Sequence, residues 1–172
     1  EGDSSTRITS FDSDGFTIST DPSVNGNQNK ILAWSWAANG GTRTTNTESG
    51  NNPGGGFQAN TTAGFSIVDY TGTGAAGTMA HGLGAVPHWI LFKSRSEASN
   101  NWAVYHHRNT AAPETDFLRL DTNAATTDNA NFMNDTAPTS SVFTVNDGSK
   151  VNSDGETYIA YAWTEVKGFS KF

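Results

Sequence analysis

The chain has 172 residues, of which 16% are charged; its net charge is −7, its pI is near 4.8, and it contains no cysteine. This length fits one domain, or one domain with part of a neighbour. Without cysteine there are no disulfides, thiol nucleophiles or cysteine-based zinc sites. The acidic balance, with no run of lysine or arginine, disfavours nucleic acid as a partner. No apolar run approaches the roughly 20 residues that a membrane span needs, so no membrane contact is expected.

An internal repeat organises the chain. Residues 13–41 match residues 140–168 without a gap, and eight of the 29 positions are identical, against about two expected by chance at ordinary residue frequencies. Each copy predicts a β-hairpin, in which a short strand, a polar turn and an apolar strand ending at a tryptophan follow one another. The chain is therefore predicted to hold the hairpin of a preceding repeat and one nearly whole repeat of a tandem array.

The repeat divides the chain into three predicted parts. Residues 1–41 are interpreted as the C-terminal hairpin of the preceding repeat, and residues 57–172 as the main repeat. Residues 42–56 are mostly Gly, Thr, Asn and Ser, which is typical of a flexible linker or a long surface loop. The sequence leaves open whether residues 1–41 and 57–172 form one compact unit.

Four short β-favouring segments follow the predicted linker, each bounded by turn residues: 63–70, 88–93, 102–106 and 116–120. Residues 122–132 are too rich in Asn, Thr and Asp for a stable helix and are predicted to be a loop. Short strands at this spacing predict an all-β fold, namely an antiparallel β-sandwich or a jelly-roll-like arrangement with long Gly-, Asn- and Thr-rich loops.

A set of segments in this chain is familiar as a group: 10–17, 63–74, 81–87, 101–106 and 134–143. Together they resemble a tandem repeat domain of unknown function found in virion structural, tail fibre-like proteins of marine and cyanobacterial tailed phages. The resemblance implies an extracellular location in a virion, other virion or repeat subunits as partners, and a homo-oligomer. It brings no established catalytic or binding residues.

One turn stands out between two of the predicted strands. His81 is followed by Gly82 and Gly84, which permit positive φ, and by Pro87, which fixes the entry into the next strand. We expect a structural turn held by a hydrogen bond between the imidazole and the backbone. A catalytic base would need a nucleophile and an orienting acid around it, and the sequence has no motif for either.

Ligand binding is expected, if anywhere, around the segment that contains Trp102 and Tyr105. Aromatic rings can stack on the apolar face of a sugar, and the polar residues Asn101, His106 and Arg108 lie beside them. The alternative is a half-buried strand without a ligand. Most of the other tryptophan and tyrosine side chains are expected in the core, since Trp36 and Trp163 end apolar segments.

No metal or cofactor is expected. The segment 12–15 looks like the opening of a calcium loop, but the aligned residues 139–142 carry no carboxylate, so a plain turn is favoured. We therefore expect a non-enzymatic structural or binding module of a phage virion, such as a tail fibre or appendage that attaches to host-surface glycans. The alternatives are a capsid decoration protein, a bacterial surface adhesin or filament subunit, and a polysaccharide depolymerase.

Overall fold

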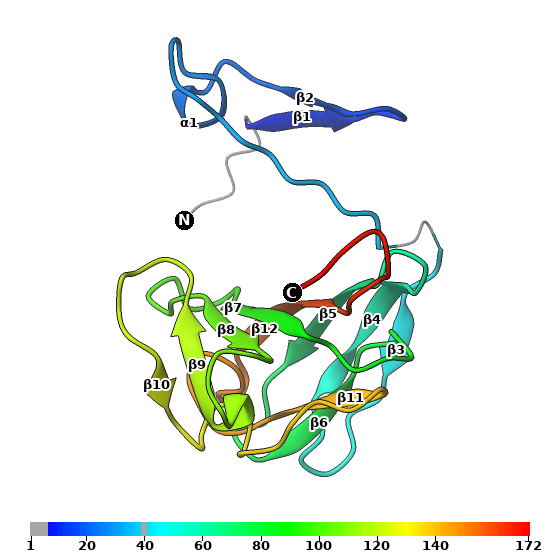
Figure 1. Ribbon diagram of the computed structural model, residues 1–172, viewed down its shortest axis with the longest axis vertical. Coiled ribbons are helices and arrows are strands. Elements are labelled where there is room, and N and C mark those ends of the chain that lie inside the picture. Colours follow the sequence, from blue (N-terminus) through cyan, green and yellow to red (C-terminus); the bar gives the residue numbers. More distant parts are fainter. Residues whose placement is uncertain (1–6, 39–40) are drawn as a thin grey trace. The chain divides into compact units, whose positions relative to one another are not determined.

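The computed structural model describes residues 7–38 and 41–172, and the chain divides into two compact units, Glu1–Trp36 and Ala37–Phe172 (Figure 1). Both consist almost entirely of β-strands and loops. The predicted all-β class is therefore confirmed. Within the described ranges, no helix is long and apolar enough to cross a membrane.

The first unit is small and pairs only two strands. Its elements are β1 (Ile8–Phe11), β2 (Phe16–Ile18) and α1 (Pro22–Asn25). The two strands pair antiparallel. Asp21 caps the short helix, because its carboxylate accepts the backbone N–H of Ser23 at 2.8 Å. Residues 30–38 form no strand, although the sequence predicts one at 31–36.

The second unit is built on one antiparallel sheet of eight strands. In spatial order these strands are β10 (Thr127–Asp128), β9 (Asp116–Arg119), β8 (Ala103–His106), β7 (Trp89–Ser94), β12 (Thr157–Trp163), β5 (Phe65–Thr71), β4 (Gly54–Asn60) and β3 (Thr44–Asn46). A separate pair consists of β6 (Gly77–Ala80) and β11 (Val142–Val145). A short 3-10 helix, η1 (Pro113–Thr115), precedes β9.

The core lies between the eight-stranded sheet and the β6–β11 pair. Alternate residues of a strand point to opposite faces of its sheet, and one buried cluster joins the inner residues of both sheets. Phe92 of β7, Phe143 of β11 and Tyr158 of β12 are fully buried there. Ala160 of the central strand β12 faces the same cluster, and its small side chain leaves room for these rings. Two layers around one core are the predicted sandwich.

Buried polar groups hold the loop that joins β11 to β12. The Tyr70 hydroxyl donates to the carbonyl of Val151 at 2.6 Å. The fully buried Asn152 accepts the backbone N–H of Thr73 at 2.9 Å and donates to the carbonyl of Ala75 at 2.7 Å. This loop is therefore fixed to the connection between β5 and β6, and each of these buried polar side chains is satisfied.

The predicted linker at 42–56 is corrected by the structure. This segment contains β3 and the start of β4, which pair with each other and extend the main sheet beside β5. Glycine is needed there because the strands approach closely: a Cβ on Gly55 would lie 2.0 Å from the carbonyl oxygen of Asp69. The boundary between the units lies at Trp36 and Ala37 instead.

The predicted hairpins are also corrected. In the second copy both strands form, as β11 and β12, but they belong to different sheets: β11 pairs with β6, whereas β12 lies between β5 and β7. In the first copy, β2 pairs with the preceding strand β1 rather than with residues 31–36. Adjacent strands in a sequence need not pair when a sandwich places them in opposite layers.

Candidate functional site

The candidate site lies on the face of the eight-stranded sheet that points away from the core, and we call this surface the outer face. Because successive residues of a strand point to opposite faces, every second residue of β5, β12 and β7 lies on the outer face. The residues of neighbouring strands that pair with these lie on it too. Its members include Phe65, Ile67, Asp69, Trp89, Leu91, Lys93, Trp102, Val104, Ile159, Tyr161 and Trp163. The outer face is thus apolar at one end of the strands and polar at the other.

Aromatic rings dominate the apolar end. The rings of Trp102 and Tyr161 stack with centroids 6.2 Å apart and planes 24° apart, and Tyr161 stacks in turn with Phe65 at 6.4 Å. The rings of Trp89 and Trp163 lie 4.6 Å apart. Phe65 and Trp163 are buried, and the ring of Phe172 packs against Trp89 at 5.7 Å. Trp89, Trp102 and Tyr161 remain partly accessible. Partial burial raises the pKa of the Tyr161 hydroxyl, so this ring keeps its proton and remains a donor at neutral pH.

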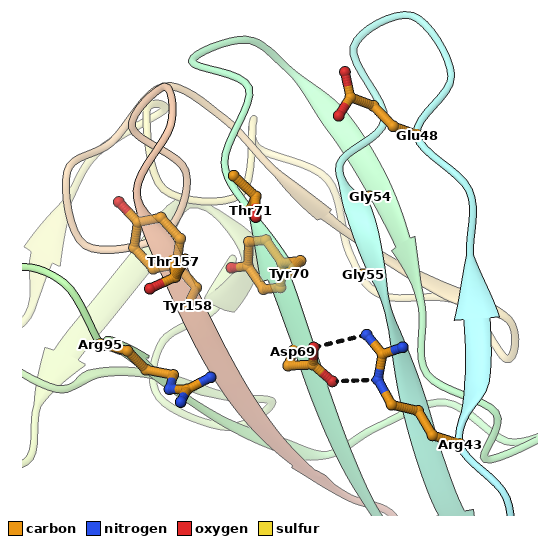
Figure 2. A pocket seen from close by; sticks show the side chains of 10 residues that line it. All are labelled: Arg43, Glu48, Gly54, Gly55, Asp69, Tyr70, Thr71, Arg95, Thr157 and Tyr158. Carbon is orange, nitrogen blue, oxygen red and sulfur yellow. Dashed lines mark hydrogen bonds and ion pairs between the residues drawn. The ribbon is translucent and has the colours of Figure 1, made fainter.

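The polar end holds a cavity of about 330 Å³ (Figure 2). The guanidinium of Arg43 donates two hydrogen bonds of 2.7 Å, from Nε and Nη2, to the two carboxylate oxygens of Asp69. This pairing raises the pKa of Arg43 further. Arg95, which directly follows β7, lines the cavity on the side of β12 and is exposed. Planar, bidentate pairs of this kind hold their groups in fixed directions.

The aromatic and polar parts of the outer face together offer two kinds of contact. Stacked, partly accessible rings offer a flat apolar surface, and a fixed guanidinium–carboxylate pair beside them offers donors and acceptors. A saccharide presents both an apolar ring face and a rim of hydroxyls. Arg95 adds a cation that can bind a carboxylate or phosphate substituent on such a sugar.

The ligand-binding residues expected from the sequence are not brought together. Trp102 lies on the outer face, as a binding residue would require. Tyr105 is 4% exposed and belongs to the core on the other side of the sheet. The grouping of these two rings in one site is therefore wrong, because residues three apart on a strand point to opposite faces.

The polar residues of that expected site are spread along the same segment. Asn101 is half-buried before β8 and Arg108 is exposed after it. His106 pairs with Trp89 and so lies at the outer face, but its Nδ1 accepts the backbone N–H of Arg108 at 3.1 Å. Trp89 begins β7 and Arg95 follows its last residue, so His106 lies at the opposite end of the strands from Arg95.

A cluster of three histidines, which the sequence pattern did not predict, lies at the end of the strands where β7 begins. The ring of His107 lies 4.6 Å from that of His88 and 5.4 Å from that of His106. Burial, with the neighbouring His107 as the next cause, lowers the pKa of His88 and of His106. Among the described residues, no group of three or more His, Cys, Asp or Glu side chains is arranged to hold a metal ion.

The turn at His81 is structural in its contacts. The buried imidazole accepts the backbone N–H of Leu83 on Nδ1 at 3.2 Å, and its Nε2 lies 3.2 Å from the carbonyl oxygen of Thr139. The Nε2–H tautomer satisfies both contacts. Gly82 and Gly84 both have φ of +69°, as the sequence predicts for this turn, and Pro87 follows them before β7.

The comparisons with known proteins add a family and no function. No curated protein and no solved structure matches the chain. A family model matches residues 1–172, which includes both units and the whole outer face. The chain therefore belongs to the DUF7483 family, described as a domain of unknown function.

Proposed function

We propose that this protein is a structural and binding module of a phage virion, in a tail fibre or appendage, and that its outer face binds a host-surface glycan. The observation that carries the binding proposal is the outer face itself, where stacked aromatic rings adjoin the Arg43–Asp69 pair and Arg95. An outer face of this composition suits contact with an extended saccharide.

Two further features support a building block rather than an isolated receptor. The chain carries a second copy of the segment that contains β11 and β12, as a tandem array would. Its resemblance to virion repeat domains points to a phage appendage, to partners of the same kind in the same particle, and to a homo-oligomer.

Glycan binding can be tested on an array of bacterial surface polysaccharides. We expect Trp102→Ala and Arg95→Ala each to weaken binding about tenfold or more, since one removes an aromatic ring of the outer face and the other its exposed cation. Lys30→Ala is the control, because this exposed cation belongs to the first unit and the outer face belongs to the second. Equal binding by all four proteins, or no binding by the unmodified chain, would contradict the binding proposal.

The virion proposal has its own test, which is independent of glycan binding. Quantitative mass spectrometry of purified particles should find the protein in a few copies per virion. Hundreds of copies would indicate a capsid decoration protein, and absence from the particle would indicate a bacterial surface protein. The release of reducing sugar from a bound polysaccharide would indicate a depolymerase.

A further inference from the structure

The two matched segments share backbone geometry as well as sequence. Four backbone hydrogen bonds occur at aligned positions of both copies. Those of the first copy run from Asp12 to Gly15, Val24 to Asp21, Asn25 to Asp21 and Asn29 to Gly26, and those of the second from Thr139 to Val142, Val151 to Gly148, Asn152 to Gly148 and Glu156 to Ser153. The same turns therefore form in the same order in both.

The backbone angle φ at one aligned position also agrees between the two copies. Gly155 has φ of +72°, and the aligned residue Gln28 has φ of +66°. The left-handed region is unfavourable for a residue with a Cβ. Gln28 adopts it nevertheless, so the first copy keeps the local fold of the second even where glycine has been replaced.

In the second unit, the segment 140–163, which contains β11 and β12, completes the sandwich. The backbone N–H of His81 donates to the carbonyl of Ser141, so the main-chain groups of Ser141, Phe143 and Val145 face β6. β12 has a partner on both edges, β5 and β7. β11 thus completes the small layer by pairing with β6, and β12 is a central strand of the eight-stranded layer.

In the first unit, no strand within residues 7–38 pairs with the edge of β2 that faces away from β1. The backbone N–H of Asp12 donates to the carbonyl of Gly15, so Gly15 and Thr17 face β1, and Phe16 and Ile18 face the other way. The edge that pairs with β6 in the second copy is therefore the edge that β1 does not occupy. Residues 30–36, aligned with β12, form no strand in the part of the chain that the structure describes.

The side chains that these edges would bury are exposed. Phe16 is 38% exposed, whereas its aligned residue Phe143 is fully buried, and Trp36 is 43% exposed, against 4% for Trp163. Asn25 also differs from its counterpart: its amide donates to the nearby carbonyl of Ser19, whereas that of Asn152 reaches across to Ala75. A groove of about 610 Å³ in this unit is lined mostly by apolar residues, including Phe16, Ile18 and Trp34.

We propose that residues 13–36 are the two closing strands of another copy of this fold, which precedes this one in the same polypeptide. Their partner is the part of that copy equivalent to residues 37–139, which has an inner face and strand edges to fill. Residues 15–18 pair with the β6 of that copy, and residues 30–36 insert between its β5 and β7. Successive sandwiches are then joined through a central strand rather than by a flexible linker.

The proposal predicts where an added copy must be joined. The constant offset aligns Arg7 with Asn134, so residues 37–133 placed directly before Arg7 should form a second complete sandwich. We expect hydrogen exchange at the amides of residues 31–36 to slow by roughly 100-fold or more relative to the 172-residue chain. Tryptophan emission should shift to shorter wavelength as Trp36, aligned with the buried Trp163, becomes buried, and as Trp34, aligned with Tyr161, becomes partly buried. Unchanged exchange would overturn the proposal.

A complete added copy is the matched control. When residues 37–172 precede Arg7, the added sandwich already contains its own closing strands, so residues 31–36 should exchange as fast as in the 172-residue chain. Protection by this complete copy as well would mean that the segment sticks to any neighbouring surface, which would overturn the proposal.

Two substitutions sharpen the result. Ala33 is exposed and aligns with the fully buried Ala160, so Ala33→Asp should abolish the protection in the extended chain and leave the melting temperature of the 172-residue chain unchanged. Thr20→Asp adds the same charge at a position aligned with the exposed Asp147 and should preserve the protection. Loss of protection in both variants, or in neither, would contradict the proposed register. This test involves no glycan, so its outcome is independent of the binding proposal.

Discussion

The two faces of the eight-stranded sheet are made by the same strands but differ in their roles: the inner face packs into the core, and the outer face offers a surface for contact. On the inner face, residues such as Phe92 and Tyr158 are fully buried with the β6–β11 pair. On the outer face, Trp102 and Tyr161 keep part of their rings accessible, and the polar end opens into a cavity. Strand alternation separates the two, so the stability of the sandwich and its capacity for contact can change independently.

The same comparison explains where polar groups are tolerated. Inside, polar side chains have fixed partners, as Asn152 has in Thr73 and Ala75. Outside, the Arg43–Asp69 pair remains 42% and 40% exposed, so water competes for its hydrogen bonds. We therefore expect substitutions inside to affect folding and those outside to affect binding.

The largest effect is expected from Phe143→Ala. This ring is fully buried and contacts Phe92 edge to face at 5.3 Å, so its removal leaves a cavity. The free energy of unfolding should fall by about 3–5 kcal/mol, measured by urea denaturation. The aligned substitution Phe16→Ala should change that of the second unit in the 172-residue chain by less than about 0.5 kcal/mol. Similar losses in both variants would contradict the comparison.

A smaller loss is expected from Asn152→Ala. The change leaves the backbone N–H of Thr73 and the carbonyl of Ala75 without their partner in a buried place. We expect a loss of about 2 kcal/mol in the free energy of unfolding. Asn25→Ala, at the aligned exposed position, is the control and should have little effect on the same transition. A neutral Asn152→Ala would show that the loop from β11 to β12 is held in another way.

Local sequence patterns located most strands of the main sheet. The segments 63–70, 88–93, 102–106 and 116–120 correspond to β5, β7, β8 and β9 within one or two residues. These strands are apolar and bounded by turn residues, which are local signals. β4 was missed because Gly54, Gly55 and Gly56 are typical of a linker. The close approach of β3 and β5 requires glycine at 55 and 56, where a Cβ would clash with Asp69 and Thr44.

Pairing across the sequence could not be predicted in the same way. The pairing of β11 with β6 and the ion pair between Arg43 and Asp69 join residues far apart in the chain, and no local pattern encodes either. The misplacement of Tyr105 is different, because its spacing from Trp102 already put the two rings on opposite faces. That signal was in the sequence.

The pH dependence should come partly from the buried His81, which follows β6. Burial lowers the pKa of His81, although the hydrogen bond to Thr139 opposes this. The folded state therefore favours neutral imidazole, so the stabilising contribution is complete above the unfolded pKa of about 6.5 and is lost as pH falls below it toward the folded pKa.

A comparison with His81→Gln measures this contribution. Urea denaturation at about pH 7 and about pH 5 should show that the unmodified chain loses more stability on acidification than the variant does. His88 and His106 on the outer side remain in both proteins and serve as an internal control. Parallel losses in the two proteins would assign the acid sensitivity to these histidines instead.

The smallest effect on folding, and the sharpest separation of the two faces, is expected at Asp69. Because the Arg43–Asp69 pair is about half exposed, Asp69→Asn should lower the free energy of unfolding by less than about 1 kcal/mol. Glycan binding should nevertheless weaken several-fold, since the variant loses the fixed carboxylate that orients Arg43. A variant that unfolds far more easily, with binding unchanged once folded, would place the pair among the groups that hold the sheet together.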